Sequence, residues 1–114
     1  MNPLLKHYCV DVDFPQVSGA EHLEMLQIRD RLAELEPTLS SEERKALLEA
    51  DRRLARQAAA FCAELSRFVS LAEHRLQHPI PPSHWWWYLD VISEVPRFEI
   101  TRPVSSLAKA GIAS

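Results

Sequence analysis

Three histidines in the second half of the chain are the residues best suited to metal chemistry. His74 and His78 lie four residues apart, so a helix would place them on one face, and His84 follows after a proline-rich turn. Imidazoles at this spacing can hold a metal ion, with Asp90 or Glu73 as an added carboxylate ligand. In the alternative interpretation, His74 and His78 complement the negative C-terminal end of their helix. The sequence leaves a metal site at His74, His78 and His84 open.

A second group of reactive side chains alternates near the N-terminus. If this segment is a strand, one of its faces carries His7, Cys9, Asp11 and Asp13. Such a face could form a metal or acid–base surface, and Cys9 with His7 could form a nucleophile–base pair. No third residue that would orient the pair is identifiable. The alternative is the solvent-exposed face of a strand, so we predict no catalytic residues.

An aromatic block, Trp85 to Tyr88, follows the proline-rich turn. Successive residues of a helix point about 100° apart, so three consecutive tryptophans cannot share one face. They could all be buried, stack on a ligand, or contribute to an interface, where tryptophan is a preferred residue. We expect Trp86 or Trp87 to lie in an interface. The full set of predicted partner-binding residues is Trp85, Trp86, Trp87, Phe61, Phe68, Tyr8, Val10 and Val12.

The N-terminal group belongs to a segment whose apolar residues alternate strictly. Tyr8, Val10, Val12 and Phe14 share one face of residues 6–14, which predicts a half-buried strand that ends at Pro15. Because a single strand is unstable, it needs a partner. That partner could be residues 97–101 or the same strand of a second copy. The segment could equally be an extended arm on another protein.

Two long amphipathic helices are predicted next. Ser18 with Glu21 and Ser40 with Glu43 have the spacing of capping boxes, and the helices extend over residues 18–36 and 40–78. The short linker between them predicts an antiparallel hairpin. In the longer helix, a coiled-coil-like seam repeats every seven residues, at Leu47, Leu54, Phe61 and Phe68.

The longer helix is too long for its neighbour to cover. We expect a third helix over residues 84–94, capped by Ser83, to fold back over the far half. One polar residue interrupts the apolar seam. Asp51 is therefore expected either to be solvated near the turn or to pair with a basic residue of the helix over 18–36.

Composition limits the classes of function. The chain has 114 residues and a net charge of −3, so its overall charge argues against a nucleic-acid partner. With only two glycines it contains no glycine-rich phosphate loop, and its two cysteines do not make a disulfide framework. No signal peptide or membrane-spanning run is visible, so we expect a cytoplasmic protein. Residues 1–103 should form one domain, and residues 104–114 a flexible tail.

The sequence therefore predicts a mainly α fold, built on a helical hairpin with a short aromatic helix and a minor β arm. The predicted function is a small protein–protein interaction module or regulatory subunit that acts by binding rather than catalysis. An inhibitor or antitoxin-like role fits its size and acidity, and the expected partner is another protein or a second copy of the chain in a homodimer. The alternative is a helical protein that binds a metal or small ligand through the three histidines; no other cofactor is expected.

Overall fold

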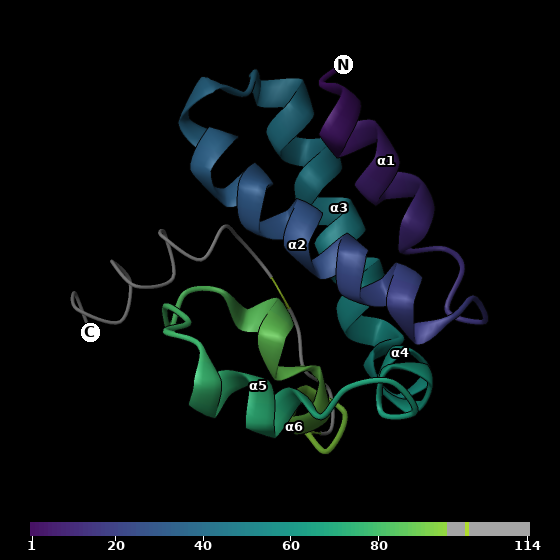
Figure 1. Cartoon of the computed structure of the whole chain (residues 1–114). Helices are drawn as coiled ribbons and strands as arrows, with labels where there is room; N and C mark the ends of the chain where they lie inside the picture. Colours follow the sequence, from purple (N-terminus) through teal and green to yellow (C-terminus); the bar gives the residue numbers. More distant parts are fainter. Residues whose placement is uncertain (96–99, 101–114) are drawn as a thin grey trace.

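The structure, a computed structural model, describes residues 1–95 and Ile100, and this part of the chain contains helices and turns but no strand (Figure 1). The predicted mainly α class is confirmed, and the predicted β arm is wrong. The α-helices are α1 (Pro3–Asp11), α2 (Gly19–Leu35), α3 (Ser41–Arg56), α4 (Ala58–Leu65), α5 (Leu71–Gln77) and α6 (Leu89–Ile92). Two 3-10 helices, η1 (Glu36–Thr38) and η2 (Trp85–Tyr88), complete the elements.

Residues 6–14 are not a strand because α1 begins before them and contains most of them. The Asn2 side chain accepts hydrogen bonds from the backbone N–H groups of Leu4 and Leu5, and proline occupies the first helical turn. Leu5, Tyr8 and Val12 then follow at helical spacing and are all buried. Tyr8 and Val12 belong both to the alternating pattern and to this helical stripe. Val10, which the alternating pattern placed on the same apolar face, is exposed.

The start of α2 and the start of α3 agree with the sequence. The hydroxyl of Ser18 accepts from the backbone N–H of Glu21. At α3, Ser40 and Glu43 each accept a hydrogen bond from the other's backbone N–H, which completes a capping box. Local capping alone therefore predicts both helix starts.

The single helix predicted over residues 40–78 is wrong, since α3, α4 and α5 replace it. The first break is at Gln57, which leaves helical geometry and donates its side-chain amide to the carbonyl of Val12 at 3.1 Å. The second break covers residues 66–70, after which the Ser70 hydroxyl caps α5 by accepting from Glu73 N–H. Neither break contains glycine or proline, and the first coincides with the long-range contact of Gln57 with Val12.

The order of packing differs from a simple hairpin. α1 packs against both α2 and α3, α2 also packs against α4, and α4 packs against α6. The predicted hairpin is not confirmed, because α1 fills the space beside both long helices (Figure 1). The expected cover over the second half of the long helix does exist, since α6 lies on α4.

The third helix predicted over residues 84–94 is shorter and begins later. It consists of η2 and α6, and His84 rather than Ser83 precedes it, without a side-chain cap. Two further predictions fall outside the described residues: the strand at 97–101, apart from Ile100, and the tail at 104–114. The seam is confirmed at Leu47, Leu54 and Phe61, which are buried, and is wrong at Phe68, which is exposed.

Candidate functional site

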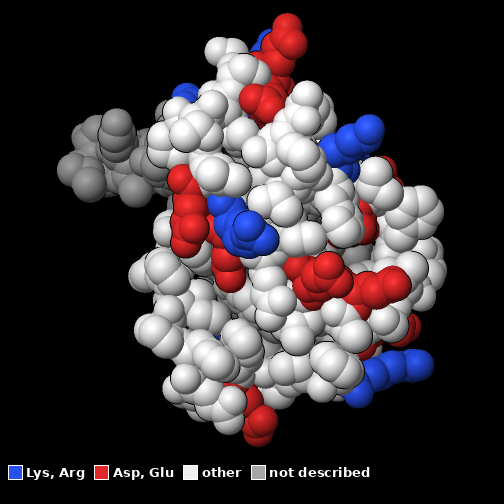
Figure 2. All heavy atoms as spheres, turned by 45° about the horizontal axis from the view of Figure 1, so that its top comes forward, with Lys and Arg blue, Asp and Glu red and all other residues white. Residues whose placement is uncertain are grey.

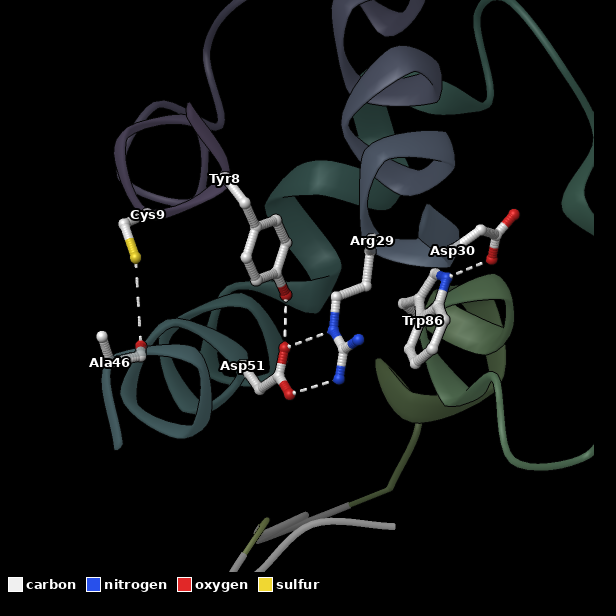
Figure 3. Close-up of polar contacts among 7 residues, drawn as sticks. All are labelled: Tyr8, Cys9, Arg29, Asp30, Ala46, Asp51 and Trp86. Carbon is white, nitrogen blue, oxygen red and sulfur yellow. Dashed lines mark hydrogen bonds and ion pairs between the residues drawn. The ribbon is translucent and has the colours of Figure 1, made fainter. Parts of the chain in front are cut away.

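A buried ion pair joins α2 to α3 at the centre of the fold. Arg29 donates from Nε and Nη2 to the two carboxylate oxygens of Asp51, each at 2.9 Å, and Tyr8 of α1 donates its hydroxyl to the same carboxylate at 2.6 Å (Figure 3). Asp51 therefore pairs with a basic residue of α2, as one of the two sequence expectations stated. Because three helices contribute, the group fixes their relative positions.

Burial and charge shift the titration of this group. Burial raises the pKa of the Tyr8 phenol well above its usual range, and the neighbouring Asp51 charge raises it further. Burial acts to lower the pKa of Arg29, but Asp51 outweighs it and holds that pKa above the ordinary value. Tyr8 therefore stays a neutral donor and Arg29 a cation, which suits a structural role rather than proton transfer.

Asp30, the next residue of α2, organises the aromatic block. Its Oδ1 atom accepts from the indole N–H groups of Trp86 and Trp87, both at 2.8 Å, and lies 3.0 Å from Nδ1 of His84. One carboxylate oxygen thus holds three rings of the segment that follows the proline-rich turn. No local sequence pattern predicts this role of Asp30.

All three tryptophans are buried within the chain, because neighbours surround the short 3-10 helix on several sides. Trp86 lies over the guanidinium of Arg29, with 4.1 Å between the Arg29 Cζ atom and the ring centroid. Trp87 stacks on His74 of α5 with ring centroids 4.4 Å apart, and Trp85 meets Trp86 edge-on. Their side chains therefore lie in the core and not on an accessible interface.

The three histidines predicted as metal ligands fall into two separate arrangements. His74 lies between His78 and Trp87, with ring centroids 4.2 Å from His78, whereas His84 stacks on Trp86 beside Asp30. Burial lowers the pKa of His74, and the nearby His78 adds to this effect. Among the described residues, no three His, Cys, Asp or Glu side chains converge to form a metal site. The structure therefore does not bring His74, His78 and His84 together.

The reactive residues of the N-terminal segment are dispersed around α1. His7 pairs with Asp11 one helical turn away at 3.1 Å, and Cys9 approaches the carbonyl of Ala46 at 3.9 Å. Asp13 accepts from Arg53 of α3 at 2.9 Å. A helix thus separates side chains that a strand would have aligned, and Cys9 and His7 form no pair.

The remaining predicted partner-binding residues are divided between the core and the surface. Tyr8, Val12 and Phe61 are buried, whereas Val10 and Phe68 are exposed. Phe68 lies just after α4, close to the start of α2: a Cβ atom added to Gly19 would meet its Cβ at 2.9 Å. The loop that precedes Gly19 carries two more exposed apolar residues, Phe14 and Val17.

We call these three residues, Phe14, Val17 and Phe68, the apolar end. In Figure 1 the loop between α1 and α2 leads to the start of α2, where Gly19 lies close to Phe68, so the loop and Phe68 lie at the same end of the molecule. Phe68 is 60% exposed and Phe14 is 52% exposed. The loop is anchored by His22, whose Nε2 lies 3.0 Å from the carbonyl oxygen of Pro15 and whose ring meets Phe61 edge-on.

A pocket of about 230 Å³ opens on another side of the molecule. It lies between the second half of α2, η1 and the turn before Trp86. Arg29 contributes to its wall, and the Nη1 atom of Arg29, which is buried beneath the surface, has no hydrogen-bond partner among the described residues. The lining residues are Arg29, Ala33, Glu34, Glu36, Ser83, His84 and Trp86.

Charged side chains of both signs are interspersed on the face shown in Figure 2, and they leave wide uncharged areas between them. Two arginines in the second half of α3 form ion pairs within the chain. Arg53 binds Asp13, and Arg52 binds Glu49 at 2.7 Å. These pairs reduce the positive charge available for a phosphate backbone.

No helix among residues 1–95 has the length and apolar character needed to span a membrane. Comparison of the chain with protein-family models, with curated proteins and with solved structures found no match.

Proposed function

We propose that this protein acts by binding another protein chain through the apolar end, and that a second copy of itself is the partner. The observation that carries the proposal is the exposure of two phenylalanines, Phe68 and Phe14, at one end of the fold. Burying a phenylalanine contributes on the order of 1.5–3 kcal/mol, so covering both would favour association.

The backbone under the apolar end is well supported, which favours a preformed binding surface. Gly19 allows α2 to approach α4 so closely that an added Cβ would lie 2.6 Å from the carbonyl oxygen of Glu64. The contact of His22 with Pro15 holds the loop from the other side. A surface that is ordered before binding loses less conformational entropy when it associates.

Sedimentation velocity of the wild type and two matched variants tests this function. Phe68→Ser removes an aromatic ring from the apolar end, and Leu76→Ser removes a large apolar side chain that is 87% exposed on α5. We expect a dimer for the wild type and for Leu76→Ser, and a monomer for Phe68→Ser. Circular dichroism should show equal helix content in all three proteins.

Two results would contradict the proposal. One is a wild type that stays monomeric over the whole micromolar range. The other is an equal loss of association in Phe68→Ser and Leu76→Ser, which would show that general surface hydrophobicity, and not the apolar end, drives it. A regulatory, inhibitory or antitoxin-like role in the cytoplasm remains a prediction that requires an identified partner.

A further inference from the structure

A positively charged side chain borders the apolar end next to α4. Arg67 directly precedes Phe68 in the turn that follows α4, and both residues are exposed. The side chain of Arg67 makes no hydrogen bond or ion pair with the described residues, including Glu64 one helical turn earlier. Its charge is therefore available to a partner that covers Phe68.

Negatively charged side chains gather where the end of α1 meets the start of α2. Asp11 is the last residue of α1, and Glu21 and Glu24 lie in the first two turns of α2. Burial raises the pKa of Asp11, and the nearby charges of Glu24 and Glu21 raise it further, against the opposite effect of His7 and His22. None of the three carboxylates pairs with a lysine or arginine among the described residues. We call Asp11, Glu21 and Glu24 the acidic group.

The first turns of α2 separate the two charges. Gly19 faces α4, because a Cβ atom added to it would lie 2.9 Å from Cβ of Phe68. At about 100° per helical residue, Glu21 lies about 200° and Glu24 about 140° around the axis from Gly19. Both glutamates therefore lie on the side of α2 that faces away from α4. The apolar end thus has a basic side next to α4 and an acidic side at the contact of α1 with α2.

We propose that two copies of the chain associate through the apolar end in a two-fold arrangement that places Arg67 of each copy against the acidic group of the other. In a two-fold interface each contact occurs twice, so one pair of complementary sides provides two attractive contacts. The opposite placement would bring the two acidic groups together, and they would repel each other. This inference rests on the proposed function and adds to it the orientation of the two copies.

Charge reversal tests this orientation. Arg67→Glu places a carboxylate against the acidic group, and Glu21→Arg places a cation against Arg67. Each single variant should weaken the dimer about tenfold in sedimentation velocity, and the variant with both changes should regain wild-type affinity. Arg31→Glu is the matched control, because it reverses an exposed charge on the same helix about 18 Å from Gly19, and its affinity should equal that of the wild type. Circular dichroism should show equal helix content in all these proteins.

Mixing the two single variants tests the same contacts in a second way. The chain with Arg67→Glu has acidic residues on both sides of the apolar end, and the chain with Glu21→Arg has a basic residue on each side. The two chains can therefore form both attractive contacts only with each other. We expect native mass spectrometry of the equimolar mixture to show mainly the heterodimer, with an affinity about tenfold higher than that of either variant alone.

Salt provides a test that needs no substitution. Salt screens ion pairs at the rim of an interface, so the wild-type dimer should become about threefold weaker at high sodium chloride concentration. A dimer that salt strengthens would indicate like charges at the interface and would contradict the proposed orientation.

The outcomes separate this inference from the proposed function. If Phe68→Ser abolishes a wild-type dimer but Arg67→Glu and Glu21→Arg leave its affinity unchanged, the orientation is wrong and association through the apolar end stands. A double variant as weak as the single variants, or an equal loss in Arg31→Glu, would also overturn the orientation. If the wild type stays monomeric, the orientation and the proposed function are both wrong.

Discussion

The guanidinium of Arg29 and the carboxylate of Asp51 form a two-point ion pair that crosses from α2 to α3 in the interior of the protein, with both nitrogen–oxygen distances at 2.9 Å. Removing one partner leaves the other charge buried. We therefore expect Asp51→Ala to lower the free energy of unfolding by about 3–5 kcal/mol, as measured by urea denaturation. Asp13→Ala, which breaks the more exposed pair with Arg53, should cost at most about 1 kcal/mol.

The combined variant Arg29→Met, Asp51→Leu removes both charges of the ion pair and replaces them with apolar side chains that still occupy the space. Because both buried charges are removed together, the decrease in the free energy of unfolding should be clearly smaller than the sum of the decreases caused by Arg29→Met and Asp51→Leu alone. Additive losses would show that the two side chains do not stabilise each other.

Tyr8 should make the fold sensitive to alkaline pH. Its pKa is raised in the folded state, so its contribution to stability is complete below the unfolded pKa of about 10 and is lost as pH rises above that value. We expect the free energy of unfolding to fall above about pH 10, and Tyr8→Phe to remove this part of the slope. Tyr88→Phe is the matched control.

Both cysteines should be replaced by alanine in that experiment. Burial raises the pKa of the Cys9 and Cys62 thiols as well, and their ionisation would overlap with the window of interest. An equal slope in the Tyr8→Phe and parent proteins would contradict the assigned role of Tyr8.

Gly19 permits the close contact between α2 and α4. An added Cβ would lie 2.6 Å from the carbonyl oxygen of Glu64 and 2.9 Å from Cβ of Phe68, so part of the backbone must move. Gly19→Ala should therefore lower the free energy of unfolding by about 1–3 kcal/mol in thermal or urea denaturation. Ala20→Leu, an exposed change at the adjacent position, should stay within about 0.5 kcal/mol. A stabilised Gly19→Ala protein would contradict this packing.

Asp30 should control the environment of two of the three tryptophans. Asp30→Ala removes the acceptor of the Trp86 and Trp87 indole N–H groups and should lower the free energy of unfolding by about 2–4 kcal/mol. In NMR spectra these two indole signals should move much more than the signal of Trp85. Equal shifts of all three signals would indicate a general rearrangement instead of a specific loss.

The sequence predicts helix starts well where a side chain caps the backbone locally. Ser18 and Ser40 signal α2 and α3, and the same spacing at Ser70 and Glu73 signals α5, although the long amphipathic pattern concealed it. Asn2 with Pro3 marks α1 in the same way. The alternation of residues 8–14 suggested a strand because two buried positions four residues apart satisfy both the strand period and the helix period.

The sequence does not predict the parts of the fold that depend on distant contacts. The break at Gln57 follows from its contact with Val12, 45 residues earlier in the chain. The site residues show the same limit: the partner of Asp51 was among the expectations, but the unpaired nitrogen of Arg29 and the three donors at Asp30 appear only in three dimensions. The four-residue spacing of His74 and His78 correctly indicates that they lie together. It does not indicate that His84 lies apart from them, beside Asp30.

Photo-crosslinking from position 68 tests the proposed association most directly. Benzoylphenylalanine replaces Phe68 in one protein and Leu76 in a matched protein, and both are irradiated at the same micromolar concentration. We predict a covalent dimer from position 68, with mass spectrometry locating the link near Phe14, Val17 or Phe68 of the second copy, and little product from position 76. No dimer from position 68, or as much from position 76, would contradict association through the apolar end.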